Sequence, residues 1–280
     1  MSGSLHVVAT PIGNLGDITR RAVEVLGSVH AVACEDTRHT GRLLQHLGVR
    51  PEQLFRCDMH TERDASRRII DLLGAGHDVA LVSDAGTPGV SDPGAVVVQA
   101  VVAAGFDVVP IPGASAALAA LVASGLPTDR FVVEGFLPRK GGDRRRRLGV
   151  VAGEERTTVV YESPRRLGTT LVDLAEVCGP DRVASVSREL TKLHEETVRG
   201  SLQELAEHFS DDVRGEIVIV VGPASPPDPA TDEDVDDFLA RLAADGVDRR
   251  SAVAAAVERL GVRKRTAYDA SLRLEWSPPT

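Results

Sequence analysis

The residues best suited to chemistry lie in one loop, SDAGTPGVSDPG at 83–94. The loop follows the apolar run VALV at 79–82, which has the pattern of a buried β-strand, and it carries two carboxylates, Asp84 and Asp92. In open α/β sheets, ligands bind beyond the carboxyl ends of the strands. Glycines there let a ligand touch the backbone, and the acids can accept from a hydroxyl or lie beside a cation. The loop therefore predicts one wall of a small-molecule site.

Two more loops of this kind follow strand-like runs, ATPIGNLGD at 9–17 and PGASAALAAL at 112–121. The second opens a helix, whose free amides face the loop while its small side chains leave space for a flat ring. One such loop is more often only a tight turn, but three at strand ends favour a pocket for a ligand with an apolar or aromatic part and a polar handle. Phosphate fits poorly, since the two carboxylates would repel it and none of these loops carries a lysine.

The chain lacks the motifs of the common nucleotide and hydrolase sites. There is no GxGxxG after the first strand, no GxxxxGK followed by Ser or Thr, no HExxH and no GxSxG. The three cysteines, Cys34, Cys57 and Cys178, show no CxxC spacing, and the histidines form no pair four residues apart. We therefore expect neither disulfides nor a metal site.

Composition and charge fit an ordinary globular protein of 280 residues, 42% hydrophobic and 26% charged. No apolar run approaches the length of a membrane span and no signal peptide is evident, so we expect a cytoplasmic protein without membrane attachment. A net charge of −9 disfavours a protein coated in basic patches. Two segments, 139–147 and 249–265, are nevertheless strongly basic and suited to a polyanion.

Apolar periodicity predicts an α/β protein. In the first part, 1–112, strand-like and helix-like segments alternate, which favours a mostly parallel sheet with helices on both faces. The strands are expected at 5–10, 29–34, 78–82 and 106–110, and the helices at 17–27, 37–47, 63–75 and 92–104.

A second α/β domain is expected at 113–222, with a mixed sheet because the stretch 196–221 favours antiparallel pairing. Its strands are predicted at 131–135, 157–161, 183–187 and 216–221, and its helices at 114–124, 143–152, 164–177 and 201–208. A Pro-rich linker at 223–231 and a small helical module at 232–280 follow. The module's helices, 232–244, 249–260 and 263–274, include a break at Gly261 with helix-turn-helix spacing, and Trp276 is expected to cover their core.

Several segments together resemble the tetrapyrrole methylase superfamily, and within it the bacterial enzymes that methylate a cytidine ribose of 16S ribosomal RNA. The similarity covers about residues 5–222, and it is the combination that is specific, since pieces such as PGASA are shared across the superfamily. The segments are ATPIGNLGDITRRA (9–22), CEDTRHTGRLL (34–44), SDAGTPGVSDPG (83–94), PGASAALAAL (112–121), GFLPRK (135–140) and YESPRRL (161–167).

The resemblance implies two α/β domains with S-adenosylmethionine in the cleft between them, and a homodimer. Acceptors in the loops also suit a sulfonium better than a lining of Lys or Arg would. The positions it implies for cofactor binding are Pro11, Asp84, Gly86, Thr87, Gly113, Ser115, Ala116, Tyr161, Glu162 and Glu189.

The implied reaction is methyl transfer to a ribose 2′-oxygen in the decoding region of 16S ribosomal RNA. The implied substrate is this RNA within the 30S subunit. Asp36 and Arg38 are predicted to orient substrate, with helix capping by Asp36 or Thr37 as the alternative. Lys192 is predicted to stabilise the developing oxyanion, and Glu35 and His60 are further candidates, although a lone loop histidine is more often only solvated. The predicted RNA contacts are Arg139, Lys140, Arg144, Arg145, Arg249, Arg250 and Lys264.

Two departures from the family pattern affect the catalytic assignment rather than the donor pocket. Arg165 stands where the family commonly has histidine, and Thr61 where it often has asparagine. Two other functions remain open: methylation of a tetrapyrrole or another small metabolite, and a non-catalytic RNA- or partner-binding regulator. The two basic segments favour RNA, because a tetrapyrrole enzyme would not need them.

Overall fold

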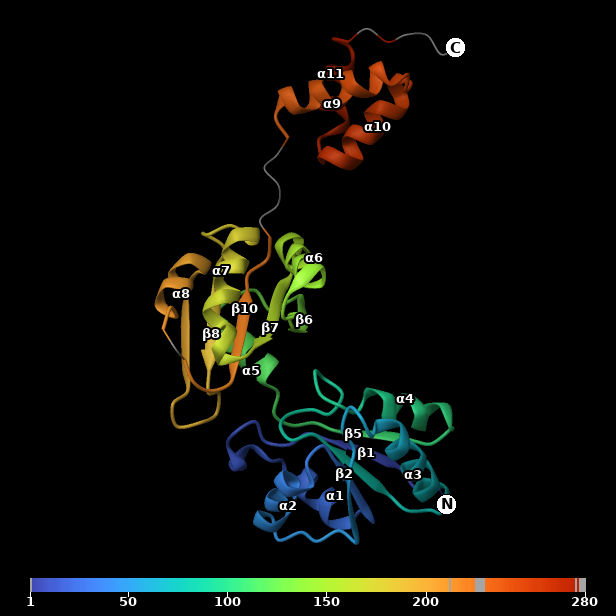
Figure 1. Cartoon of the computed structure of the whole chain (residues 1–280). Helices are drawn as coiled ribbons and strands as arrows, with labels where there is room; N and C mark the ends of the chain where they lie inside the picture. Colours follow the sequence, from blue (N-terminus) through green and yellow to red (C-terminus); the bar gives the residue numbers. More distant parts are fainter. Residues whose placement is uncertain (1, 212, 225–229, 275, 277–280) are drawn as a thin grey trace. The chain divides into compact units, whose positions relative to one another are not determined.

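The computed structural model describes residues 2–211, 213–224, 230–274 and 276. The chain divides into two compact units, Met1–Ala224 and Ser225–Thr280 (Figure 1). Residues 225–229 of the predicted linker lie outside the described residues. In the described part of the chain, no helix combines the length and apolarity needed to cross a membrane.

The first unit begins with a parallel five-stranded sheet in the order β3-β2-β4-β1-β5. Helices lie on both faces, as predicted, because each strand alternates its side chains between two cores. Leu81 of β4 packs toward the α3 and α4 side, and Val82 toward the α1 and α2 side. The elements are β1 (Leu5–Val8), α1 (Arg20–Ser28), β2 (Ala31–Cys34), α2 (Thr37–His46), β3 (Gln53–Arg56), α3 (Glu62–Gly74), β4 (Val79–Val82), α4 (Ala95–Ala103) and β5 (Val108–Ile111), with a 3-10 turn, η1, at Leu15–Asp17.

The edge strand β3 was not predicted. Only Phe55 of its residues is buried, whereas all residues of β2 and β4 are buried. A strand with a single buried side chain shows no hydrophobic period, and therefore only its pairing with β2 reveals it.

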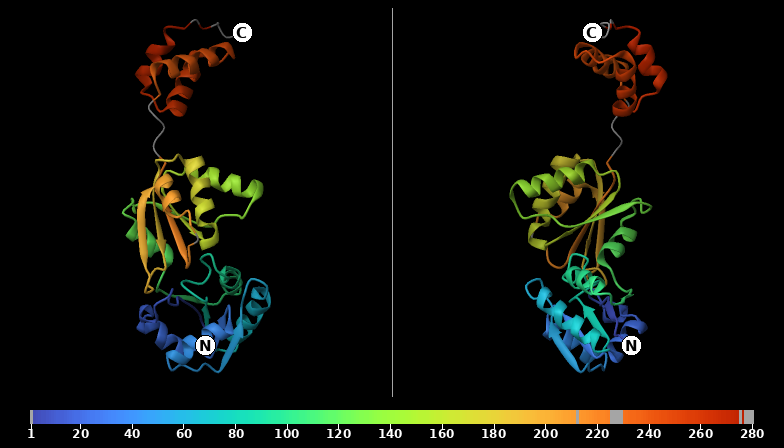
Figure 2. Two further views of the ribbon diagram at one scale, coloured as in Figure 1. Left: turned by 60° about the vertical axis from the view of Figure 1, so that its left-hand side comes forward. Right: turned by 90° about the vertical axis from the view of Figure 1, so that its right-hand side faces the viewer.

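A second five-stranded sheet follows in the order β6-β7-β10-β8-β9. Its β6–β7 pair is parallel and its other pairs are antiparallel, which confirms the predicted mixed sheet. Helix α5 packs on one face, and α6, α7 and α8 pack on the other (Figures 1 and 2). The bounds are α5 (Ala116–Ser124), β6 (Phe131–Phe136), α6 (Gly141–Gly153), β7 (Thr157–Glu162), η2 (Pro164–Arg166), α7 (Leu167–Cys178), β8 (Val183–Arg188), β9 (Glu196–Ser201), α8 (Leu202–His208) and β10 (Ile217–Val221).

The second unit is a small helical bundle of α9 (Asp232–Ala244), α10 (Arg249–Leu260) and α11 (Lys264–Ser271). Its core is built from small and aliphatic side chains, including Leu239 and Ala256. The Trp276 indole packs against this core, as predicted, and donates to the Ser271 carbonyl at 2.8 Å. Gly261 ends α10 in the left-handed conformation, with φ of 64°.

Candidate active site

The predicted loops meet at the carboxyl ends of β1, β4 and β5. Thr10 and Gly86 exchange backbone hydrogen bonds of 2.9 and 3.1 Å, which join the loop after β1 to the loop after β4. Gly86 has φ of +76°, a conformation that favours glycine. The third loop, after β5, packs closely against the loop after β1, since a Cβ on Gly113 would lie 2.9 Å from the Cβ of Ala9. The three loops therefore form one continuous surface.

This surface borders a cavity of about 400 Å³, here called the glycine-loop cavity. The loops supply Gly86, Thr87, Ser115 and Ala116, and the second sheet and its loops supply the opposite wall. Phe136 and Tyr161 form an aromatic part of that wall, with ring centroids 5.5 Å apart. Ser115 caps α5, accepting from the amide of Leu118, so the helix begins at the cavity. Small side chains and an aromatic wall suit a flat apolar ring.

Asp92 is one carboxylate of this cavity, and the sequence analysis named it with Asp84 as an acid that can accept from a hydroxyl or lie beside a cation. It is half-buried, and this burial, with repulsion from Glu35 and Asp84, raises its pKa to about 6. A cation beside Asp92 would relieve the cost of its ionisation, so the cavity fits a ligand that carries a sulfonium or an ammonium group. Asp92 lies in the same loop as Asp84. The occurrence of two acids in one loop at a strand end is the sequence feature that pointed to a carboxylate in the ligand site.

Glu162 borders the glycine-loop cavity, but its carboxylate is fully buried. It accepts from Arg166 Nε at 2.8 Å, Thr170 Oγ1 at 2.7 Å and the Ser163 amide at 2.7 Å. Burial alone would raise the pKa of Glu162, but these donors outweigh it and lower the pKa. These bonds fix the turn that follows β7, and the cofactor contact of Glu162 stays a prediction.

A second cavity, of about 350 Å³, is here called the α2 cavity. Ile12, Ala85 and Glu216 line both cavities, so the two adjoin. Pro11 and Asp84, predicted to bind the cofactor, line this cavity rather than the first. The remaining lining residues are Gly13, Leu15, His39, Thr40, Arg42, Leu43, His46, Ser83 and Lys192.

Lys192 reaches the α2 cavity with its charge already paired. Its ammonium lies 2.9 Å from Glu189 Oε1 and 3.2 Å from Glu216 Oε2. Burial would lower the pKa of Lys192, but the two carboxylates outweigh it and raise the pKa. Glu189, predicted to bind the cofactor, borders neither cavity and instead holds Lys192 and the Glu216 amide. The stem of Lys192 packs on Gly13, where a Cβ would lie 2.6 Å from its Cγ.

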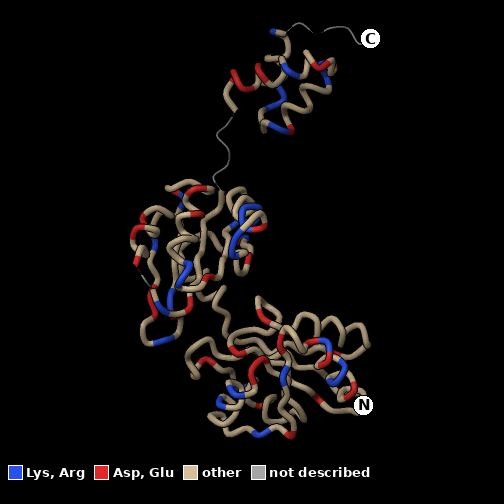
Figure 3. The backbone as a smooth tube through the Cα atoms, in the orientation of Figure 1, with Lys and Arg blue, Asp and Glu red and all other residues tan. Residues whose placement is uncertain are grey.

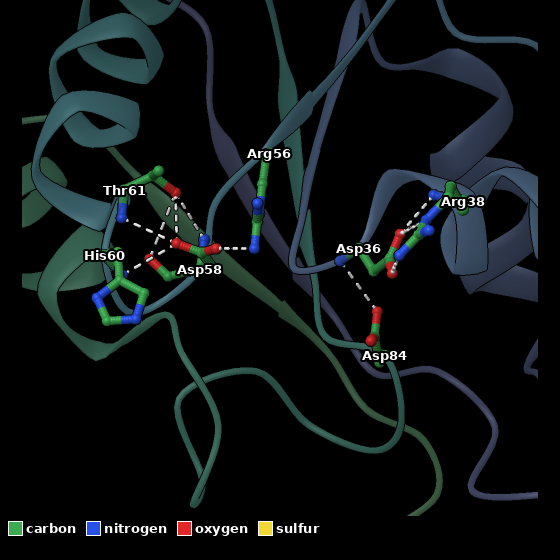
Figure 4. A network of polar contacts seen from close by, with 7 residues as sticks. All are labelled: Asp36, Arg38, Arg56, Asp58, His60, Thr61 and Asp84. Carbon is green, nitrogen blue, oxygen red and sulfur yellow. Dashed lines mark hydrogen bonds and ion pairs between the residues drawn. The ribbon is translucent and has the colours of Figure 1, made fainter.

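The other predicted catalytic residues, Glu35, Asp36, Arg38 and His60, line neither cavity. Asp36, rather than Thr37, caps α2 by accepting from the Arg38 amide at 2.8 Å, and its carboxylate pairs with the exposed Arg38 guanidinium (Figure 4). These bonds from Arg38 lower the pKa of Asp36. Asp84 accepts from the Asp36 amide at 3.2 Å. Asp36 and Arg38 thus form a helix cap that is bonded through the Asp36 amide to Asp84 of the α2 cavity, and their role in orienting substrate stays a prediction.

Glu35 and His60 have different environments. Burial, with repulsion from Asp84, raises the pKa of Glu35. The His60 side chain is exposed in a turn around Asp58, which accepts from the amides of His60 and Thr61 at 2.9 Å (Figure 4). The histidine therefore has the solvated environment that the sequence analysis gave as the alternative to catalysis.

One predicted RNA contact is contradicted. The Arg144 side chain is buried, because its position on α6 turns inward, and it donates to Asp173 Oδ2 at 2.8 Å and Thr170 Oγ1 at 3.0 Å. The other predicted basic residues are exposed, and Figure 3 shows cationic residues along α6. These exposed predicted contacts are Arg139, Lys140 and Arg145 in the first unit, and Arg249, Arg250 and Lys264 in the second.

Comparison with known proteins places this geometry in context. The family model of the Tetrapyrrole (Corrin/Porphyrin) Methylases matches residues 4–206. A Synechocystis relative called ribosomal RNA small subunit methyltransferase I is 47% identical over 98% of this chain and 99% of its own. Relatives of the same name in Pseudomonas aeruginosa and Escherichia coli O157:H7 are 45% and 43% identical, over 97% and 96% of this chain and 98% and 95% of theirs.

Solved structures share the fold of the first unit. The methyltransferase CobJ aligns with a TM-score of 0.60 at 23% identity, over 80% of this chain and 95% of CobJ. Uroporphyrin-III C-methyltransferase from Thermus thermophilus, complexed with S-adenyl homocysteine, aligns with a TM-score of 0.55 at 22% identity, over 79% of this chain and 97% of that enzyme. These similarities confirm the predicted fold class.

Proposed function

The chain belongs to the tetrapyrrole (corrin/porphyrin) methylase family, and we propose that it methylates small-subunit ribosomal RNA with S-adenosylmethionine as the donor. The observation that carries this proposal is the near full-length identity of 43–47% to relatives called ribosomal RNA small subunit methyltransferase I. Solved structures of tetrapyrrole enzymes are under 25% identical and support only the fold.

The glycine-loop cavity is the proposed donor site. Gly86, Thr87, Ser115 and Ala116 would hold the nucleoside part against the Tyr161 wall, and Asp92 would face a positive group. When bound, the donor supplies a methyl group on a positive sulfur, and its transfer breaks a C–S bond, forms a C–O bond and releases the acceptor's hydroxyl proton to solvent. Ile12 and Ala85, which with Glu216 border both cavities, mark where donor and acceptor can meet.

The acceptor proposed here is the ribose 2′-oxygen of a cytidine in the decoding region of 16S ribosomal RNA, within the 30S subunit. Lys192 supports an oxygen acceptor, since its paired carboxylates keep it protonated and hold its ammonium at the wall of the α2 cavity. Holding the two reactants in line supplies a further part of the rate enhancement. The exposed arginines and lysines of α6 and of α10–α11 would grip RNA phosphates.

The enzyme is also proposed to be a homodimer. Leu118 and Val122 lie four residues apart on α5 and are 50% and 74% exposed, which provides an apolar face on that helix. Sedimentation of the full chain tests this proposal: a Leu118→Lys, Val122→Lys variant should shift a wild-type dimer to monomer. A wild-type protein that sediments as a monomer would refute it.

Calorimetry and labelled-methyl transfer test the function. Wild-type protein should bind S-adenosylmethionine and transfer methyl to 30S subunits, and nuclease mapping should place the label on a cytidine ribose. Absence of donor binding would instead favour the non-catalytic regulator. Transfer to a porphyrinogen but not to 30S subunits would favour the small-metabolite enzyme.

A further inference from the structure

The α2 cavity presents a row of basic side chains that the donor site does not use. His39, Arg42 and His46 line it from α2, together with Leu43. Their spacing of three and four residues places them on one face of the helix. Lys192 and Asp84 line the same cavity, and Asp84 Oδ1 lies 3.6 Å from His39 Nδ1. The α2 face therefore offers Arg42 and His46 as donors for an anion.

Arg42 differs from Lys192 and Arg38 because, among the described residues, no carboxylate pairs with its charge. Lys192 pairs with two carboxylates, and Arg38 pairs with Asp36. Arg42 is exposed, and no acidic side chain in residues 2–211, 213–224, 230–274 and 276 lies within ion-pairing distance of it. A guanidinium with free donors binds phosphate by two parallel hydrogen bonds.

The rest of the cavity suits a sugar and a base. Its volume of about 350 Å³ is within the usual range for a small-molecule site. Pro11, Ile12 and Leu15 provide apolar walls, and the Asp84 carboxylate can accept from a ribose hydroxyl or from the amino group of cytosine. Because Ile12 and Ala85 also border the glycine-loop cavity, a sugar at that point would adjoin the donor.

We propose that the α2 cavity binds one nucleotide of the RNA substrate, with its phosphate on Arg42 and His46 and its sugar toward Ile12 and Ala85. This inference rests on the proposed function and deepens it by naming the subsite. It places the RNA strand against α2 of the first sheet, in addition to the basic residues predicted on α6 and in the second unit.

The test compares Arg42→Ala with Arg50→Ala, since Arg50 is an exposed arginine just beyond α2 that borders neither cavity. Methyl transfer to 30S subunits is measured at several salt concentrations, and S-adenosylmethionine binding by calorimetry. Arg42→Ala should raise the KM for 30S subunits about tenfold, as expected for one lost charged contact. It should also reduce the slope of log affinity against log salt by about one. Donor affinity should stay unchanged, and Arg50→Ala should behave as wild type.

A second variant tests the space rather than the charge. Leu15 is 44% exposed and lines only the α2 cavity, so Leu15→Trp should fold, bind the donor normally and lose methyl transfer by filling the subsite. Melting temperatures verify folding of all variants.

The outcomes separate the inference from the function on which it rests. Wild-type protein that neither binds donor nor methylates RNA would refute the proposed function. Active wild type with unaltered Arg42→Ala and Leu15→Trp kinetics would overturn the nucleotide subsite alone. Equal losses in Arg42→Ala and Arg50→Ala would also overturn it, because they would indicate a general effect of charge.

Discussion

Replacing Asp92 by asparagine removes one carboxylate of the proposed donor site with little change in volume. In the ligand-free protein, burial raises the pKa of Asp92 to about 6. The donor is positive at its sulfur and its amino group, so it binds the ionised form of Asp92 better. Affinity should therefore increase as the pH rises through the free-protein pKa, with release of a proton on binding at lower pH.

The size of this effect follows from that pKa. At pH 5, roughly one Asp92 in ten is ionised, and at pH 7 nearly all are. The affinity for S-adenosylmethionine should thus be about tenfold weaker at pH 5 than at pH 7. The range also lies below the usual pKa of an α-amino group, near 8, so the donor's own charge stays nearly constant. In Asp92→Asn the affinity should be weak and independent of pH.

Calorimetry in two buffers of different ionisation enthalpy measures both quantities, the affinity and the proton release. Asp71→Asn is the matched control, because Asp71 is exposed on α3 and borders neither cavity. It should follow the wild-type pH profile. A wild-type affinity that is flat from pH 5 to 7, or an Asp92→Asn profile like that of wild type, would refute the assignment.

The raised pKa of Asp92 also affects the stability of the ligand-free protein. A carboxyl whose pKa is higher in the folded than in the unfolded state binds its proton more tightly when folded. Its contribution to the free energy of unfolding is therefore greatest below the unfolded value of 3.8 and declines as the pH rises through about 6. The melting temperature of ligand-free Asp92→Asn minus that of wild type should therefore be more positive at pH 7 than at pH 4.

Three further predictions concern residues that the proposal does not assign to donor contact. Gly13→Ala should lower both the melting temperature and methyl transfer, because Gly13 has φ of +151° and a Cβ would lie 2.6 Å from Lys192 Cγ. The control Gly41→Ala in α2 meets nothing within 4 Å and should stabilise by about 1 kcal/mol; equal effects of the two would contradict the close packing. Glu162→Gln breaks a buried ion pair with Arg166 and should cost about 3 kcal/mol in urea unfolding, whereas the exposed Glu155→Gln should cost little. A Glu162→Gln protein of wild-type stability would show that the pair adds nothing. Arg144→Ala should destabilise the protein and leave the salt dependence of RNA affinity unchanged, while Arg145→Ala should do the reverse, reducing the salt slope by about one. The opposite pattern would restore Arg144 as an RNA contact.

Much of the fold could be predicted from local pattern. Apolar runs such as VALV at 79–82 identify central strands because both faces of the sheet are covered, and glycine-rich loops after them mark the edge where ligands bind. The predicted range of α9, 232–244, matches the structure, whereas α1 begins at Arg20 rather than at 17 and α11 ends at Ser271 rather than at 274. Strand β3 was not predicted because too few of its side chains are buried to produce a hydrophobic pattern.

The donor loops were equally clear in the sequence, but their division between two cavities was not. Asp84 and Gly86 are neighbours in one loop, yet Asp84 faces the α2 cavity and Gly86 the other. The left-handed turn at Gly86 and its bonds to Thr10 redirect the chain between them. That direction depends on a partner from the loop after β1, which is distant along the chain.

The sequence alone determined which kinds of groups are present: three small-residue loops at strand ends, two acids among them, and a run of arginines at 144–147. Tertiary structure decided what each group does. It turned Arg144 inward to Asp173 while Arg145 stayed in solvent. It also paired Lys192 with two carboxylates, whereas no carboxylate in the described part of the chain pairs with Arg42. The physical reason is that the burial and partners of a charge depend on residues far away in sequence, and these set its pKa and its freedom to bind a ligand.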